Sequence, residues 1–286
     1  MLNIPLKTLG GKQFWADERV YSGWRIQRHV RAGRHRLLDP QDVRRARGSF
    51  EACEARLASL REAGKIPAPS PNAVILLHGI WRAKESLRKL QQALSAEGYE
   101  AIALNYPSTR GPIEEHAAQL ARVLARLEGA GRISFVAHSM GALVVRRYLQ
   151  DHRDARIRRL VMIAPPNRGS AMANLFDGAG VLRRTFGPAG PQMRSDALGA
   201  LAGLAAPWCE FGVIAGGKGD GRGYNPMLQG DNDMMVEVEN TKLDGMADFL
   251  LLPCLHTFIL QAPEAIEAVK NFLSIGRFRP ESAVAP

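Results

Sequence analysis

The sequence predicts an α/β fold in which a mostly parallel sheet is flanked by helices. Apolar runs rich in β-branched residues recur along the chain, and helical stretches of about 10–15 residues separate them. The run at 73–77 is apolar throughout, which indicates a strand buried on both faces, as in a parallel sheet covered by helices. A chain of 286 residues suffices for one such domain with an appendage.

The elements are expected in a regular order as far as Asn167. We expect strands at 73–77, 100–104, 132–137, 158–164, 211–215 and 249–252. Helices are expected at 84–96, 113–127, 140–149 and 263–273. Residues 168–208 interrupt this order and are rich in Gly, Ala and Leu, which predicts a helical insertion over the sheet.

The N-terminal part of the chain differs in composition. Residues 1–50 hold 11 Lys and Arg against 4 Asp and Glu, so most of the net charge of +10 lies there. The stretch 40–60 looks helical, and a proline cluster at 67–71 cannot continue a helix. We therefore expect a basic arm with a helix and a proline-rich linker over 1–70, and the main domain over 71–286. The arm is expected to pack on the main domain, with contact to nucleic acid or an anionic membrane surface as the alternative.

Composition also bears on the class of protein. No apolar run reaches the about 18 residues of a membrane span, and the first residues lack the apolar run of a secretory signal. The three cysteines, Cys53, Cys209 and Cys254, are widely spaced and contain no Cys-x-x-Cys pair. This pattern favours a reducing compartment over a disulfide framework or a cysteine zinc site. We expect a soluble, cytoplasmic protein.

The most informative motif is Ala137-His-Ser139-Met-Gly141, where a predicted buried strand runs directly into a predicted helix. A serine on such a sharp turn takes a strained backbone, and bulky residues two positions before or after it would collide. The turn lifts the serine hydroxyl out of the sheet and directs the N–H of Met140 toward the same space. The motif predicts that Ser139 is a nucleophile.

With this motif the chain resembles the α/β-hydrolase family, in particular its lipase and esterase branch, in which some bacterial lipases also carry Ala-His-Ser-Met-Gly. The resemblance covers about residues 72–275 and not the arm. It implies an α/β-hydrolase fold, with the 168–208 insertion as a lid; the alternative is that the apolar residues of the insertion only bury it on the sheet. It also implies that the His78-Gly79 pair presents the amide of Ile80 as one oxyanion-hole donor, with the amide of Met140 as the second.

The same loop and a neighbouring one supply further candidates. We expect His78 to orient the loop by hydrogen bonding and Gly79 to let the backbone approach closely. Trp81 is expected to form part of the substrate pocket, and Tyr106 is also expected in its wall.

The resemblance orders the triad as serine, acid and histidine. It places the base at His256, in the loop after the strand at 249–252. The acid is expected after the strand at 211–215, where aligning the valines with the family's Asp-Gly-x-Val-x-Val stretch selects Asp233. Asp231 is the alternative, and Met234 stands where these hydrolases carry glycine.

These residues together predict a serine hydrolase that cleaves small-molecule carboxylic esters, such as an intracellular carboxylesterase for short to medium acyl chains. No metal or other cofactor is required for this chemistry. A thioesterase, an acyltransferase and a serine peptidase would use the same triad, so these remain alternatives. A further alternative is a non-catalytic protein that binds a polyanion through the basic arm on a hydrolase scaffold.

Overall fold

The computed structural model describes residues 6–175, 180–196 and 200–280 and contains a six-stranded sheet in the order β11-β10-β9-β8-β6-β7. Every neighbouring pair in this sheet is parallel. Its strands are β6 (Asn72–Leu77), β7 (Glu100–Leu104), β8 (Arg132–His138), β9 (Ile157–Ile163), β10 (Glu210–Gly217) and β11 (Asp248–Pro253). The predicted α/β fold with a parallel sheet is therefore confirmed.

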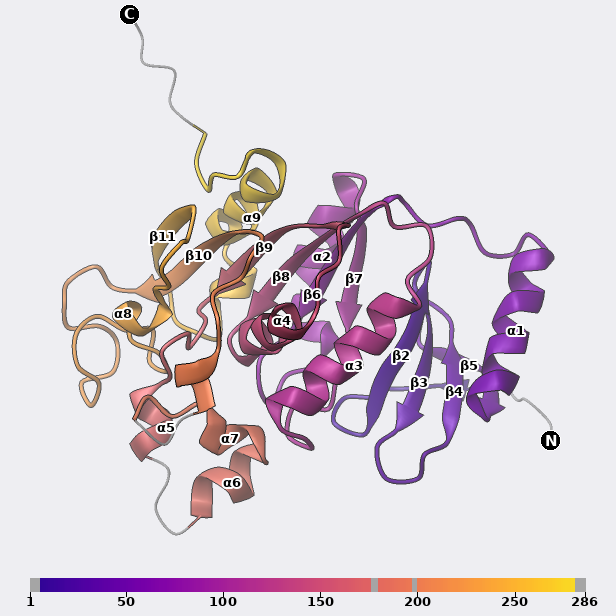
Figure 1. Ribbon diagram of the computed structural model, residues 1–286, viewed down its shortest axis with the longest axis horizontal. Coiled ribbons are helices and arrows are strands. Elements are labelled where there is room, and N and C mark those ends of the chain that lie inside the picture. Colours follow the sequence, from indigo (N-terminus) through magenta and orange to yellow (C-terminus); the bar gives the residue numbers. More distant parts are fainter. Residues whose placement is uncertain (1–5, 176–179, 197–199, 281–286) are drawn as a thin grey trace, which may run out of the picture.

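Helices cover both faces of this sheet (Figure 1). The strand β6 shows why: Val74 and Leu76 pack in the core under α2 and α9, while Ile75 and Leu77 pack in the core under α3 and α4. The helices are α2 (Arg88–Ala96), α3 (Ile113–Ala125), α4 (Met140–Asp151) and α9 (Pro263–Ile275). A short 3-10 turn, Lys84–Leu87, forms the start of the helix predicted over 84–96.

The N-terminal segment forms a second sheet, which was not predicted from the sequence. This sheet is antiparallel, has the order β1-β5-β4-β3-β2, and carries α1 (Phe50–Glu62) on one face. Its strands are β1 (Leu6–Lys7), β2 (Trp15–Tyr21), β3 (Trp24–His29), β4 (His35–Leu38) and β5 (Val43–Gly48). The expected helix over 40–60 is thus wrong in its first part. The helix begins only at Phe50, where the Ser49 hydroxyl accepts a hydrogen bond from the Ala52 amide at 3.2 Å.

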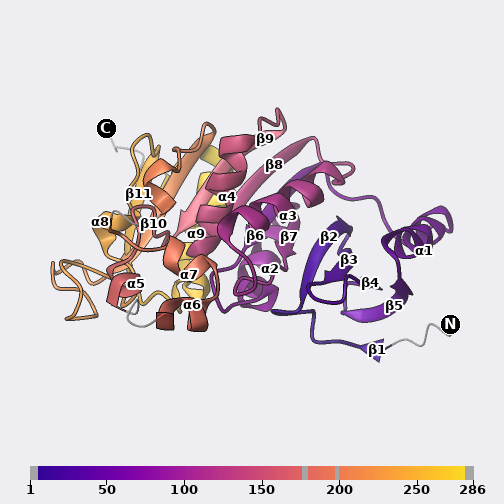
Figure 2. The same ribbon diagram turned by 60° about the horizontal axis from the view of Figure 1, so that its bottom comes forward.

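The antiparallel sheet lies beside the edge of the parallel sheet formed by β7, next to α3 (Figures 1 and 2). Val20 of β2 joins the core under α3. The junction also buries polar groups: the carboxylate of Asp17 pairs with Arg25 at 2.5 Å and accepts hydrogen bonds from Gln27 and from the Asn105 amide, both at 2.7 Å. The N-terminal segment is therefore packed into the molecule through a polar, buried contact.

Several basic residues of this segment have acidic partners. Arg28 pairs with Glu18 at 3.1 Å, and Arg45 pairs with Asp39 at 2.7 Å. Arg36 lies over the ring of Trp15, with 4.0 Å between the guanidinium carbon and the ring centroid. These three contacts lie within the N-terminal segment, while its packing on the main domain rests on Val20 and on the bond between Asp17 and Asn105. The alternative of nucleic-acid or membrane contact and the division of the chain at residue 70 stay predictions.

The insertion between β9 and β10 contains short helices, which lie together at the bottom of the view in Figure 1. They are α5 (Ala171–Leu175), α6 (Val181–Phe186) and α7 (Ala189–Gln192). The short helix α8 (Val238–Thr241) follows β10. Of the predicted insertion over 168–208, residues 176–179 and 197–199 lie outside the described residues. Within the described ranges no helix has the length and apolar character needed to cross a membrane.

Candidate active site

Ser139 occupies the sharp turn between β8 and α4 that the motif predicted. Its backbone has φ 53° and ψ −127°, a strained conformation for a residue with a side chain. Two hydrogen bonds fix the turn, from the Ser139 amide to the Ile163 carbonyl and from the Ala142 amide to the Ser139 carbonyl, each 2.9 Å. Strain of this kind persists only where the surrounding structure holds it.

Glycines allow the backbone to pack around this turn. A Cβ at Gly141 would lie 2.7 Å from the His78 carbonyl oxygen and 2.9 Å from that of Leu77. A Cβ at Gly79 would lie 3.0 Å from the Ser139 Cβ. The two carbonyl oxygens near Gly141 explain why a residue without a side chain stands two positions after the serine. The short distance at Gly79 shows that the His78-Gly79 loop lies against Ser139.

The structure brings together the three residues that were predicted as nucleophile, base and acid. Nε2 of His256 lies 3.0 Å from Oγ of Ser139, and Nδ1 of His256 lies 2.7 Å from Oδ2 of Asp233. Asp233 is fully buried, and its Oδ1 accepts hydrogen bonds from the amides of Met235 (3.0 Å) and Val236 (2.8 Å). These bonds leave Oδ2 facing the histidine, so Nδ1 of His256 is held as a donor and Nε2 as an acceptor toward the serine.

The alternative acid, Asp231, is used elsewhere. Its carboxylate accepts hydrogen bonds from the amides of Lys218 and Gly219, both at 2.7 Å, and from the Asn232 amide at 2.9 Å. It therefore closes the loop after β10, and among the described residues no hydrogen bond or ion pair joins it to His256. Met234, at the family's glycine position, has φ 87°, so it takes a backbone conformation that glycine adopts without strain.

The two predicted oxyanion donors flank Ser139. Met140 is the first residue of α4, so its amide has no acceptor inside the helix. Ile80 lies in the turn after β6, closed by a hydrogen bond from the Arg82 amide to the Gly79 carbonyl at 3.2 Å. Across the described residues, neither the Ile80 amide nor the Met140 amide donates to a protein acceptor, so both are available to a ligand.

Two buried side chains, His78 and Tyr106, form hydrogen bonds with the backbone of the loop that leads to Ile80. Nδ1 of His78 donates to the Gly79 carbonyl at 2.9 Å, as expected for a residue that orients the loop. Tyr106 donates its hydroxyl to the His78 carbonyl, and the two rings stack. The expectation that Tyr106 forms the pocket wall is therefore wrong, because its side chain is buried beneath His78. Burial also lowers the pKa of His78 to about 4, so its imidazole is neutral near pH 7.

His138, beside the serine in sequence, contacts the base. Its Nε2 lies 3.1 Å from the His256 carbonyl oxygen, and the two imidazole rings are 4.8 Å apart. Because a carbonyl only accepts, Nε2 of His138 carries the proton of this bond. Burial, and secondarily the neighbouring His256, lowers the pKa of His138 well below its ordinary value. The side chain is thus a neutral donor that holds the loop of His256.

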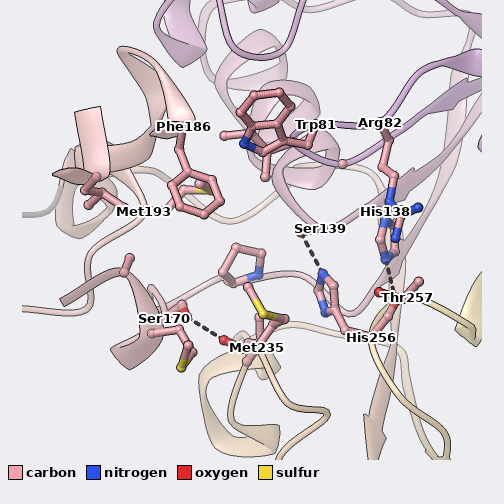
Figure 3. A pocket seen from close by; sticks show the side chains of 17 residues that line it. Trp81, Arg82, His138, Ser139, Ser170, Phe186, Met193, Met235, His256 and Thr257 are labelled. Carbon is pink, nitrogen blue, oxygen red and sulfur yellow. Dashed lines mark hydrogen bonds between the residues drawn. The ribbon is translucent and has the colours of Figure 1, made fainter. Parts of the chain in front are cut away.

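A mostly apolar cavity of about 350 Å³ opens above Ser139. Figure 3 shows Ser139 and His256 bordering it together with Trp81, Phe186 and Met193. Trp81 is 56% exposed at this opening. Ser170, at the start of the insertion, donates to the Met235 carbonyl at 2.5 Å and so ties the insertion to the loop of Asp233. In the parts of the chain that the structure describes, no three His, Cys, Asp or Glu side chains are placed to hold a metal ion.

Comparison with known proteins identifies the family. The family model described as alpha/beta hydrolase family matches residues 74–263. The chain belongs to the α/β hydrolase family. This α/β hydrolase has no match in sequence among curated proteins.

Solved structures with the same fold include proteins named as a lipase, a carboxyl esterase and a phospholipase. The mature lipase BlEst2 of Bacillus licheniformis superposes with a TM-score of 0.57 at 18% identity, covering 74% of this chain and 94% of that one. The metagenomic carboxyl esterase MGS0156 gives 0.54 at 20% identity, covering 68% of both chains. The phospholipase PlaB of Legionella pneumophila gives 0.56 at 17% identity, covering 72% of this chain and 59% of that one. At these identities the likeness concerns the fold.

Proposed function

We propose that this α/β hydrolase is a serine hydrolase that cleaves carboxylic esters through an acyl-enzyme intermediate. The observation that carries the proposal is the hydrogen-bonded series Ser139, His256 and Asp233 at the floor of an apolar cavity. The fold shared with a lipase, a carboxyl esterase and a phospholipase supports the same class of substrate.

In the proposed acylation step, Oγ of Ser139 attacks the ester carbonyl carbon and passes its proton to Nε2 of His256. The carbonyl oxygen becomes an oxyanion that accepts hydrogen bonds from the amides of Ile80 and Met140. His256 then protonates the leaving alcohol oxygen as the bond from that oxygen to carbon breaks. Asp233 keeps Nδ1 of the imidazole protonated and stabilises the imidazolium.

Deacylation repeats these steps with water as the nucleophile. Water gives its proton to His256 as its oxygen bonds to the acyl carbon, and the proton returns to Ser139 when the acid leaves. The acyl chain is assigned to the cavity, whose lining from α5 and α6 includes Met172, Leu182 and Phe186. A cavity of about 350 Å³ lies at the lower end of the range of about 300–1,000 Å³ for small-ligand sites, which favours short to medium acyl chains over long ones.

Chromogenic esters from acetyl to palmitoyl test this proposal, with wild type and Ser139→Ala assayed in parallel. We expect hydrolysis by wild type, an optimum at short to medium chain length, and a loss of at least about 10³-fold in Ser139→Ala. Ser134→Ala, a change of serine on the same strand but outside the cavity, is the matched control and should keep wild-type activity.

Assays with thioesters, with peptides and with added acyl acceptors distinguish a thioesterase, a serine peptidase and an acyltransferase. If a fluorophosphonate probe labels wild type but not Ser139→Ala, and no ester is hydrolysed, the substrate would be a thioester or a peptide, or the reaction an acyl transfer, instead of ester hydrolysis. No labelling of Ser139 at all would overturn the enzymatic proposal in favour of a non-catalytic protein on a hydrolase scaffold.

A further inference from the structure

One side chain of the N-terminal segment joins the turn that carries the Ile80 amide to the loop that follows β7. Nε2 of Gln13 donates to the Arg82 carbonyl at 2.8 Å and to the hydroxyl of the buried Ser108 at 3.0 Å. Its Oε1 accepts hydrogen bonds from the amide and the hydroxyl of Thr109, both at 3.0 Å. Both ends of the Gln13 amide are therefore satisfied by residues about 70 and 95 positions away.

The Arg82 carbonyl belongs to the turn that carries the Ile80 amide. The turn runs from Gly79 to Arg82, and Trp81 within it has φ 60°, a strained value for a tryptophan. Such a conformation is retained only where the surroundings determine it. Gly79 is held against Ser139 at one end of the turn, and Gln13 holds the carbonyl at the other end.

Gln13 is itself fixed by a buried anchor. Nδ2 of Asn105 donates to the carbonyls of Lys12 (3.0 Å) and Trp15 (2.7 Å), one on each side of Gln13. The Asn105 amide donates in turn to the buried carboxylate of Asp17. The glutamine therefore projects from a backbone segment that is attached to the end of β7.

We infer that Gln13 is a positioning residue for the oxyanion hole, so that the N-terminal segment is a working part of the active site. The inference rests on the proposed function for its catalytic consequence. Gln13 touches neither Ser139 nor His256, and acts by holding the turn that presents the Ile80 amide. An oxyanion donor must lie at about 2.7–3.1 Å from the developing charge, so a displaced turn weakens transition-state binding more than substrate binding.

The kinetic test compares Gln13→Ala, Gln13→Glu and Gln91→Ala in the full chain. Gln91 is the matched control, because its Nε2 also donates to a backbone carbonyl at 2.8 Å, that of Ala101, far from the turn. We expect kcat on the best ester to fall about 10- to 100-fold in Gln13→Ala, with KM within about threefold of wild type. Gln13→Glu keeps the acceptor for Thr109 but loses the donor to Arg82, so its kcat should fall as far. Gln91→Ala should keep the wild-type kcat.

Hydrogen–deuterium exchange tests the same inference without a substrate. In Gln13→Ala, exchange in a peptide covering 78–83 should accelerate, while exchange in α4 stays as in wild type. An unchanged kcat, an equal loss in Gln91→Ala, or unchanged exchange at 78–83 would each overturn the inference. If wild type hydrolyses no ester and Ser139 is not labelled, the proposed function fails. The exchange result then still decides whether Gln13 holds the turn.

Discussion

The ring of Tyr106 stacks on the imidazole of His78, with centroids 4.2 Å apart and planes 11° from parallel, and its hydroxyl donates to the His78 carbonyl. Both side chains are buried. One side chain from the end of β7 thus fixes both the ring and the backbone of the residue that begins the oxyanion turn. Two side chains thus hold this turn by hydrogen bonds: Tyr106 donates to the His78 carbonyl and Gln13 donates to the Arg82 carbonyl.

Tyr106→Phe should keep the stacking and lose only the hydrogen bond to His78. The His78 carbonyl would remain buried without this donor, so the free energy of unfolding should drop by about 1–3 kcal/mol, measured by urea denaturation. Tyr148→Phe is the control: its ring also stacks on a histidine, His152, at 4.6 Å, while its hydroxyl makes no hydrogen bond within the described residues. Equal stabilities of the two variants would contradict the role assigned to the Tyr106 hydroxyl.

Asp233→Asn should lower kcat by about 10³- to 10⁴-fold, because an amide facing Nδ1 no longer holds the histidine in the required tautomer. Circular dichroism should show an intact fold. Asp231→Asn, two residues away, should keep kcat within a few-fold of wild type. Its stability should drop by about 1–2 kcal/mol, because an amide replaces only part of the carboxylate's bonds to three backbone N–H groups. A large loss of kcat in Asp231→Asn with little loss in Asp233→Asn would instead identify Asp231 as the acid of the triad.

Stability should fall as the pH is lowered from 6.5 toward 4. Burial lowers the pKa of His78 and His116 from 6.5 to about 4, so in this range the unfolded chain binds protons that the folded chain does not. Each of these histidines should contribute a loss on the order of 3 kcal/mol over this range, with no such loss above pH 7. Urea denaturation across the range measures it. His116→Gln should show a shallower decline than wild type, and an unchanged decline would refute this assignment.

Asp17→Ala should destabilise the protein strongly, by about 3–5 kcal/mol in the free energy of unfolding, because it leaves the buried Arg25 without its ion-pair partner. The same truncation at Asp151 removes a surface pair with Arg147, spaced i to i+4 at 2.9 Å, and should cost at most about 0.5 kcal/mol. Similar losses in both variants would show that the junction of the two sheets adds nothing to stability.

The parallel sheet and the turn at Ser139 were predictable from sequence because local pattern determines them. A strand such as β6 is apolar throughout, since helices cover both of its faces, and the small residue Gly141 is required by contact with the backbone of Leu77 and His78. His256 and Asp233, by contrast, were placed by family resemblance, and the structure brings them within hydrogen-bonding distance of one another.

The N-terminal sheet was not predictable, because its pattern is set by distant contacts. Val43–Gly48 is rich in arginine and reads as helical, but pairing with β4 and β1 makes it a strand. No local pattern marks Asp17 and Gln27 as buried, but the structure buries both at the junction. Tyr106 follows β7 at the edge where the carboxyl ends of parallel strands meet and where ligands commonly bind, but its ring is buried against His78 instead.

The hydrogen bond between Asp17 and the Asn105 amide joins residues that are 88 positions apart. It can form only after both partners have been synthesised. During synthesis the N-terminal strands emerge first, but the acceptor at Asp17 meets this donor only after β7 has left the ribosome. Contacts between residues far apart in sequence form, as a rule, more slowly than local ones. We therefore expect the antiparallel sheet to dock after its own strands have paired, with Asp17 and Arg25 in water until the residues after β7 are available.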